Sequence, residues 1–181
     1  FLIWGLLELY EATFNDNYLL KALELNKKQT EYFWDLELGG FFNSADYGEK
    51  LLIRQKSIYD GAIPSGNSVS LHNLVRLFKI TGDPKYFEQA DKLVIVFSSE
   101  LNKSPYAFTH LLNGYKYLKD IGEEIIIVAD QNKKQLNAFI RLIHKFYLPH
   151  KIIIAKSDNI KEELSYLENY SSIDDSTTVY F

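Results

Sequence analysis

The sequence holds LYEATFNDNYLLKALEL at residues 9–25 and LFKITGDPKYFEQADKL at residues 77–93. Five residues of the first stretch recur at identical spacing in the second: Leu9, Thr13, Tyr18, Ala22 and Leu25 match Leu77, Thr81, Tyr86, Ala90 and Leu93. In each, apolar residues recur at helical spacing on both sides of a short polar break, which predicts a helix, a tight turn and a second helix. A single hairpin of this kind cannot bury its apolar face, so the repeat predicts hairpins that stack on one another.

Working outward, the same periodicity predicts five helices within residues 1–120. The fourth has the clearest start, because Asp83 can cap it and Pro84 suits the first helical position. The expected ranges are 1–14, 17–34, 68–81, 84–101 and 104–118.

A long connector, residues 35–67, separates the two hairpins. Its Gly39–Phe42 and Leu51–Ile53 runs flank a turn near Asp46–Gly48, which predicts a β-hairpin near 40–55. Connectors of this length inside a compact chain are more often functional than accidental.

The chain changes character after residue 120. Apolar runs at 125–128, 152–154 and 177–181 alternate with helical patterns at 136–146 and 160–167, which predicts a small parallel sheet in a βαβαβ module, 121–181. Asp130 and Ser157–Asp158 follow its strands, as ligand groups or as helix caps. No glycine-rich phosphate loop accompanies them, which disfavours a dinucleotide site.

Composition narrows the function. The 181 residues carry a formal charge of −4 and contain no cysteine, so the chain has no disulfide and no thiolate chemistry. A pI near 5.6 disfavours nucleic-acid binding, and no apolar run is long enough to predict a membrane span. The chain has no methionine and begins with phenylalanine, so we expect a fragment of a longer protein.

The densest candidate chemistry lies before the third helix. Asp60 is a candidate general base or hydroxyl acceptor, and Tyr59 a candidate acid or stacking surface. Ser65 and Asn67 could orient a hydroxylated ligand.

A structural interpretation of the same residues stands beside this one. Asn67 or Ser68 would then cap the third helix, and Asp60 would pair with Arg54 or Lys56.

Further candidates are aromatic residues and histidines. Trp34 and Phe41 could stack on a sugar beside the Asp35 carboxylate, or simply mark a helix end and a turn. His72 and His110, near the starts of two helices, could act as acid or base in a cleft, or pack as ordinary histidines. No histidine pair has metal-ligand spacing, so we expect no metal site and no cofactor.

The string Lys56-x-x-Tyr59-Asp60-Gly61-Ala62-x-Pro64-Ser65-Gly66-Asn67-Ser68 resembles the signature of a family of thioredoxin-domain-containing proteins that includes a mammalian spermatogenesis-associated member. The resemblance covers essentially the whole chain. It implies an N-terminal thioredoxin-like domain followed by an (α/α)6 toroid, similar to N-acylglucosamine 2-epimerases and six-hairpin glycosidases. Residues 1–120 would then be part of the toroid.

Because the implied toroid is similar to those of sugar-processing enzymes, our first hypothesis is carbohydrate binding or processing, with the fragment inactive alone and its status as an enzyme left open. We expect a cytoplasmic location. Expected partners are a sugar, the thioredoxin-like domain, the rest of the toroid and a second copy of the fragment, but no nucleic acid or membrane. Alternatively, the chain is a non-catalytic scaffold that supports redox activity of the thioredoxin-like domain.

Overall fold

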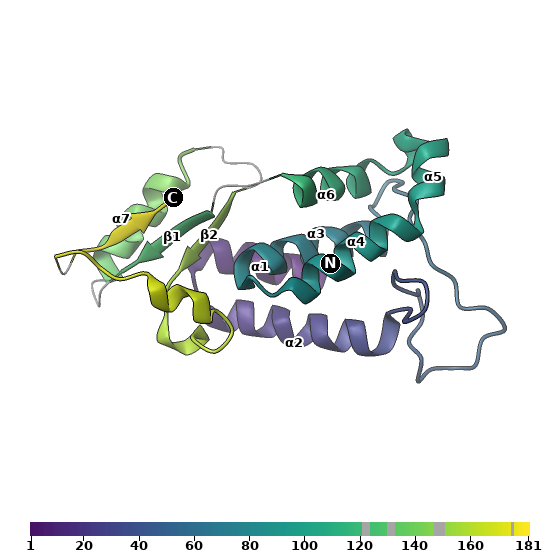
Figure 1. Ribbon diagram of the computed structural model, residues 1–181, viewed down its shortest axis with the longest axis horizontal. Helices are drawn as coiled ribbons and strands as arrows, with labels where there is room; N and C mark the ends of the chain where they lie inside the picture. The colour runs from purple at the N-terminus through teal and green to yellow at the C-terminus, as the bar shows by residue number, and fades with distance from the viewer. Residues whose placement is uncertain (121–123, 130–132, 147–150, 175) are drawn as a thin grey trace.

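The computed structural model describes residues 1–120, 124–129, 133–146, 151–174 and 176–181. Helices dominate these residues, and a small sheet lies at one end of the elongated molecule, at the left of Figure 1. The α-helices are α1 (Leu2–Thr13), α2 (Asp16–Phe33), α3 (Gly66–Thr81), α4 (Pro84–Val96), α5 (Ser98–Lys103), α6 (Thr109–Lys119) and α7 (Lys133–Ile143). The remaining elements are the strands β1 (Glu124–Val128), β2 (Ile152–Ala155) and β3 (Thr178–Tyr180), and the 3-10 turns η1 (Pro105–Ala107), η2 (Asp158–Ile160) and η3 (Ser165–Asn169).

The five helices predicted within residues 1–120 have counterparts, and the mainly helical fold class is confirmed. The fifth begins at Thr109 rather than at Ser104, because Pro105–Ala107 forms the 3-10 turn η1. Hairpin one is α1–α2 and hairpin two is α3–α4, with α3 in contact with α1, α4 and α6. The expected fourth helix is broken at Phe97, where α4 ends and α5 begins. Because α3 has neighbours on three sides, it carries the centre of the apolar core. Closure of these helices into a toroid stays a prediction.

The two hairpins share one turn design. Thr13 and Thr81 each donate a side-chain hydrogen bond to the carbonyl four residues earlier, at 2.6 and 2.7 Å. Asn15 and Asp83 then cap the following helices by accepting from the backbone N–H two residues ahead. These pairs stand at the spacing of the sequence repeat, so the repeat in the sequence is a repeat in structure.

The residue that ends the first helix of each hairpin is left-handed. Gly82 has φ 68° and tolerates it, whereas Phe14 stands in the equivalent place with φ 49°. Phe14 packs edge-on against Tyr10 and lies against both the main apolar core and the cluster between the sheet and α7. Its packing therefore offsets a backbone conformation that costs roughly 1–2 kcal/mol for a residue with a Cβ.

The sheet has the order β2-β1-β3, with β1 parallel to β2 and antiparallel to β3. The all-parallel prediction is therefore wrong for β3, because the chain turns back through the Ile173–Ser176 bridge and enters from the opposite end. The helix expected at 160–167 is also wrong: η2 and η3 stand there as short 3-10 turns.

The sheet is covered on both faces. Ile126 and Ile154 join the main core with α1 and α3, while Ile127 faces Leu136 and Ile143 of α7. Apolar continuity ties the sheet to the helical hairpins, and the division into domains at residue 120 stays a prediction.

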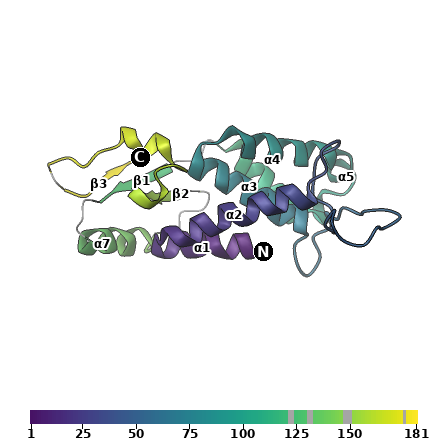
Figure 2. The same ribbon diagram turned by 90° about the horizontal axis from the view of Figure 1, so that it is seen from below.

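The β-hairpin expected near 40–55 does not form. Trp34 and Phe41 make an isolated antiparallel bridge, and Asn43 N donates to Gln55 O, but no strands follow. The apolar run Leu51–Ile53 is exposed to solvent. A two-stranded hairpin without a sheet to pack on is marginal in water, which explains the irregular loop seen at the right of Figures 1 and 2.

Candidate functional site

Asp60 lies near the end of the connector, and its carboxylate accepts hydrogen bonds from backbone N–H groups. Its Oδ1 accepts from the Ser65 N–H at 2.9 Å, and its Oδ2 accepts from the N–H groups of His110 and Leu111 at 2.8 and 3.1 Å. The last two are donors at the start of α6, which no intrahelical carbonyl can satisfy. The carboxylate therefore caps α6 from a distant loop and pairs with neither Arg54 nor Lys56.

The Ser65–Asn67 stretch also supports the backbone. Ser65 is the N-cap of α3 and accepts from the Ser68 N–H at 3.0 Å. Asn67 is 2 % exposed, donates to the carbonyls of Phe41 and Ser57, and accepts from the Phe41 N–H. Both side chains are thus engaged inside the protein.

The aromatic candidates separate into buried and exposed groups. Phe41 is buried and packs edge-on against the half-buried Trp34, with ring centroids 4.9 Å apart. Tyr59, in contrast, is exposed. Beside Trp34, the Asp35 carboxylate forms an ion pair with Lys56 at 2.7 Å, which lowers the pKa of Asp35. This pair closes the turn that leads to Phe41.

His110 takes part in a different cluster. Its ring stacks on that of His72 with centroids 4.2 Å apart, and Trp4 of α1 lies 5.5 Å from it on centroids. His72 Nε2 lies 3.0 Å from the His110 carbonyl, where it can donate. Nε2 of His110 is buried with no hydrogen-bond partner, and burial lowers the pKa of this imidazole, against the opposing effect of Asp60. His110 is therefore neutral near pH 7.

One helical turn further along α1 and α3, three charged side chains extend this cluster: Glu8, Glu11 and Arg76. Arg76 of α3 is 8 % exposed and donates to Glu8 at 2.6 Å and to Glu11 at 2.7 Å. Glu8 also accepts from the indole N–H of Trp4 at 2.9 Å. Burial raises the pKa of Glu11, while Arg76 acts to lower it.

These six side chains lie on neighbouring faces of three helices, and we call them the helix-face cluster: Trp4, Glu8, Glu11, His72, Arg76 and His110. Sequence reasoning singled out only the two histidines. A signal was available, because the register of the repeat pairs Trp4 with His72 and Glu8 with Arg76. The repeat does not predict that α6, which carries His110, packs beside α1 and α3.

Other expectations concern metals, membranes and the tail. Among the described residues, no group of three potential ligands gathers as a metal site requires, and no helix is long and apolar enough to span a membrane. Asp130 lies outside the described residues. Ser157 caps η2 and donates to Asp16 at 2.6 Å, so it is a structural contact.

Comparison with known proteins adds the relatives. The chain is 35% identical over 99% of its length to spermatogenesis-associated protein 20 of Rattus norvegicus, and 34% identical over 99% to the Homo sapiens protein. An uncharacterised protein of Caenorhabditis elegans is 31% identical over 91% of the chain. Along its length the chain is therefore similar to one segment of spermatogenesis-associated protein 20. No family model matches it.

The segment is a small part of these relatives. It spans 23% of the rat protein and 24% of the human protein. The match supports the spermatogenesis-associated resemblance and the expectation of a larger protein. The thioredoxin-like domain and the epimerase-like toroid stay predictions.

Proposed function

We propose that this chain contributes part of a carbohydrate-binding site to a larger protein, and that its contacts come from the helix-face cluster rather than from the Asp60 loop (residues 57–65). The observation that carries the proposal is the stacked His72–His110 pair beside Trp4 and the Glu8–Arg76 ion pair. All three rings are only partly buried, so they border solvent.

The chemistry of the cluster suits a polyhydroxylated ligand. Aromatic rings stack on the apolar faces of sugars, while carboxylate and guanidinium groups hydrogen-bond hydroxyls. In this proposal, ligand entry displaces the side chains that cover the buried, unpartnered Nε2 of neutral His110, and this nitrogen then accepts a proton, as a general base must. Glu8, whose side chain is 60% exposed, offers a second oxygen to a ligand.

In this proposal Asp60 is a positioning residue. Its Oδ2 accepts from the backbone N–H of His110, so it fixes the start of α6 and the imidazole that α6 carries. Tyr59 stays a candidate stacking surface, because it is exposed next to Asp60. Trp34 and Phe41 pack together, and Ser65 and Asn67 hold the backbone of the connector by hydrogen bonds.

The test is a thermal-shift screen of the full-length protein against mono- and disaccharides. We expect a sugar-specific rise in Tm that His110→Phe abolishes, since phenylalanine keeps the ring stack but removes both nitrogens. Tyr106→Phe, at an exposed tyrosine of η1, is the matched control and should keep the rise. Absence of a shift with every sugar would overturn the proposal.

Asp60→Ala separates positioning from direct binding. Because the carboxylate caps α6 and orders the Ser65 turn, its loss should lower the free energy of unfolding by about 1–3 kcal/mol. Asp60→Asn keeps one acceptor oxygen and should lose less. Loss of sugar binding at unchanged stability would instead show that the Asp60 carboxylate contacts the sugar directly.

A second function is favoured by the hydrogen bonds of the Asp60 loop. Asp60 and Asn67 bind backbone groups and Ser65 caps α3, which suits a scaffold that supports redox activity elsewhere in the protein. Disulfide reduction by the full-length protein, measured with and without Asp60→Ala below the Tm of both, tests it. The scaffold function predicts a fall in rate without any sugar present.

The exposed apolar side chains of the connector suggest the partner of this segment. Leu52, Ile53 and Ile63 are largely in solvent, and side chains of this kind drive association. We propose that they contact the rest of the larger protein, or a second copy when the segment is alone. Sedimentation of the isolated segment as a monomer at high concentration would contradict this.

A further inference from the structure

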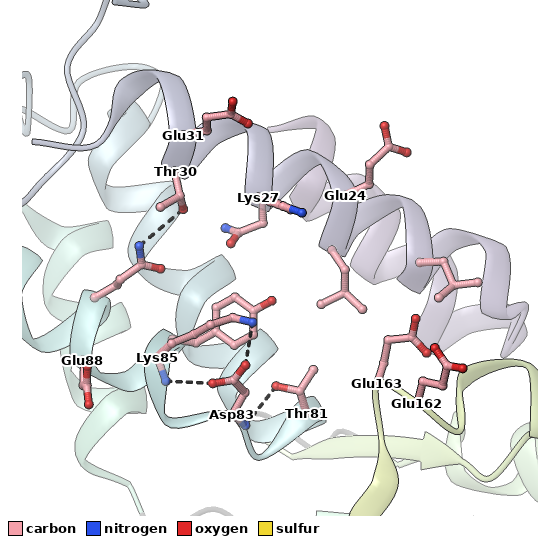
Figure 3. A pocket seen from close by; sticks show the side chains of 15 residues that line it. Glu24, Lys27, Thr30, Glu31, Thr81, Asp83, Lys85, Glu88, Glu162 and Glu163 are labelled. Carbon is pink, nitrogen blue, oxygen red and sulfur yellow. Dashed lines mark hydrogen bonds and ion pairs between the residues drawn. The ribbon is translucent and has the colours of Figure 1, made fainter. Parts of the chain in front are cut away.

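A groove runs between α2 and α4 and shares no lining residue with the helix-face cluster. Its volume is about 970 Å³, at the upper end of the range for ligand pockets. Figure 3 shows α2 along one wall, the turn before α4 opposite, and Glu162 and Glu163 of the tail at one end. On α2 it extends from Leu20 to Glu31, a distance of about 17 Å along a helix.

The floor of the groove is apolar at its centre. Leu20 and Leu23, one helical turn apart, face it from α2, and Tyr86 faces it from α4. Tyr86 is buried, while the two leucines are only partly covered. Three apolar side chains in a row leave a strip that a second apolar surface can cover.

The rim of the groove is acidic. Six carboxylates line it against two lysines: Glu24, Glu31, Asp83, Glu88, Glu162 and Glu163 against Lys27 and Lys85. Lys85 is already paired with Asp83, and Glu24 is paired with Lys21 and Lys28, which leaves Glu31, Glu88, Glu162 and Glu163 against Lys27. Within the described residues, no basic group lies within 4.0 Å of Glu88, Glu162 or Glu163. The groove therefore carries a net negative charge that its own lysines do not balance.

An independent feature points to an occupant. Asn26 lines the groove from α2, is 2 % exposed, and its Nδ2 has no hydrogen-bond partner. A buried donor without an acceptor costs about 1–3 kcal/mol. The neighbouring amide of Gln89 is engaged with Thr30, at 3.4 Å. Because Nδ2 is buried, the Asn26 side chain would rotate toward the groove to donate to the carbonyl oxygen of an occupant.

We propose that the α2–α4 groove binds a basic amphipathic helix of a partner protein. Leucine-type residues on one face of that helix would cover Leu20, Leu23 and Tyr86, in the manner of helix-in-groove recognition. Lysine or arginine residues flanking that face would meet Glu88, Glu162 and Glu163. One of the free carbonyls at the end of the helix would accept from Asn26.

The test uses the full-length protein and a fluorescent amphipathic peptide of about 14 residues, with leucine on one face and lysine on its flanks. We expect saturable binding in fluorescence anisotropy that weakens with salt. Glu162→Lys/Glu163→Lys should weaken it by about tenfold. Glu49→Lys/Glu100→Lys makes the same change of charge at exposed sites outside the groove and should alter it less than about twofold.

Asn26→Leu tests the buried amide. Removal of an unpaired donor should leave stability unchanged or raise it, while peptide affinity falls by about fivefold. Three results would overturn the proposal: equal effects of the two charge-reversed pairs, equal binding of a peptide with glutamate in place of lysine, or full competition by spermine, which would make the site a small-polycation site.

Discussion

Hairpins one and two have the same turn and opposite environments. In α3, 12 of 16 residues are buried, whereas in α1 only Ile3, Leu7 and Tyr10 are. Leu9 is 45 % exposed, and its repeat partner Leu77 is fully buried. The difference arises because α3 packs against α1, α4, α6 and β2, while α1 packs mainly against its hairpin partner α2 and makes smaller contacts with α3 and β2.

The comparison teaches which part of a repeat is local. Both hairpins have the same turn, which is built from a threonine, a capping residue and a left-handed residue. The hydrogen bonds of the threonine and the cap span no more than four residues, so this turn is determined locally. Burial depends on which helices stand alongside. Repeat partners therefore share a backbone conformation but contribute differently to the free energy of unfolding.

The largest test of this difference is the pair Leu77→Ala and Leu9→Ala. Loss of the buried side chain should lower the free energy of unfolding by about 2–5 kcal/mol, because it leaves a cavity at the centre of the core. Loss of the exposed one should change it by less than about 0.5 kcal/mol. Urea denaturation of both variants measures the contrast, and similar losses would contradict the asymmetry.

The next largest effect concerns the repeat partners Glu8 and Arg76, which form an ion pair but differ in exposure. Arg76→Met leaves Glu11 buried without its cation and should cost about 1–3 kcal/mol at pH 7. Glu8→Gln removes a largely exposed partner and should cost less than about 1 kcal/mol.

The pH dependence of Arg76→Met has a defined sign. Burial already raises the pKa of Glu11, and loss of Arg76 raises it further. A carboxyl with a raised pKa in the folded state binds its proton more readily there than when unfolded, so acid stabilises the variant. Its deficit relative to wild type should narrow as pH falls from 7 to 4. A deficit that widens would show that Glu11 is not the group left unpaired.

The smallest effect concerns the left-handed turn residues. Gly82→Ala should cost about 1 kcal/mol from backbone strain alone, since an added Cβ would approach Tyr166 no closer than 3.8 Å. At position 14, glycine should likewise be better than alanine by about 1 kcal/mol, although both lose the packing of Phe14. Thermal denaturation of Gly82→Ala, Phe14→Gly and Phe14→Ala provides the comparison, and no preference for glycine at either site would refute it.

Sequence signals that act within one helix predicted most of the helices. They failed where an element forms only if another part of the chain pairs with it or buries it. Asp83 and Pro84 marked the start of α4 correctly because a cap needs only its own turn. Leu51–Ile53 looked like a strand, yet among the described residues no strand lies beside it to pair with or bury it. The antiparallel entry of β3 depends on the turn at Asp174, whose left-handed φ of 51° no apolar pattern encodes.

In the candidate site, too, the sequence identified individual residues but not their distant partners. Asp60 was recognised as a special residue, but its partners lie far along the chain at the start of α6, so its role as a cap was not readable. His110 was named without His72 as its stacking partner. Packing of α6 against α3 creates that pair, and the spacing of residues within one helix cannot predict it.

The contact between Asp16 and the tail affects the order of folding. Asp16, in the first turn of α2, accepts from Ser157 and Asn159, which lie 141 and 143 residues later. In hairpin two, the turn is completed locally by the Asp83–Lys85 ion pair. Closure of so long a loop is entropically slow. Hairpin two can therefore mature early, whereas the turn of hairpin one acquires its last hydrogen bonds only after the tail has arrived.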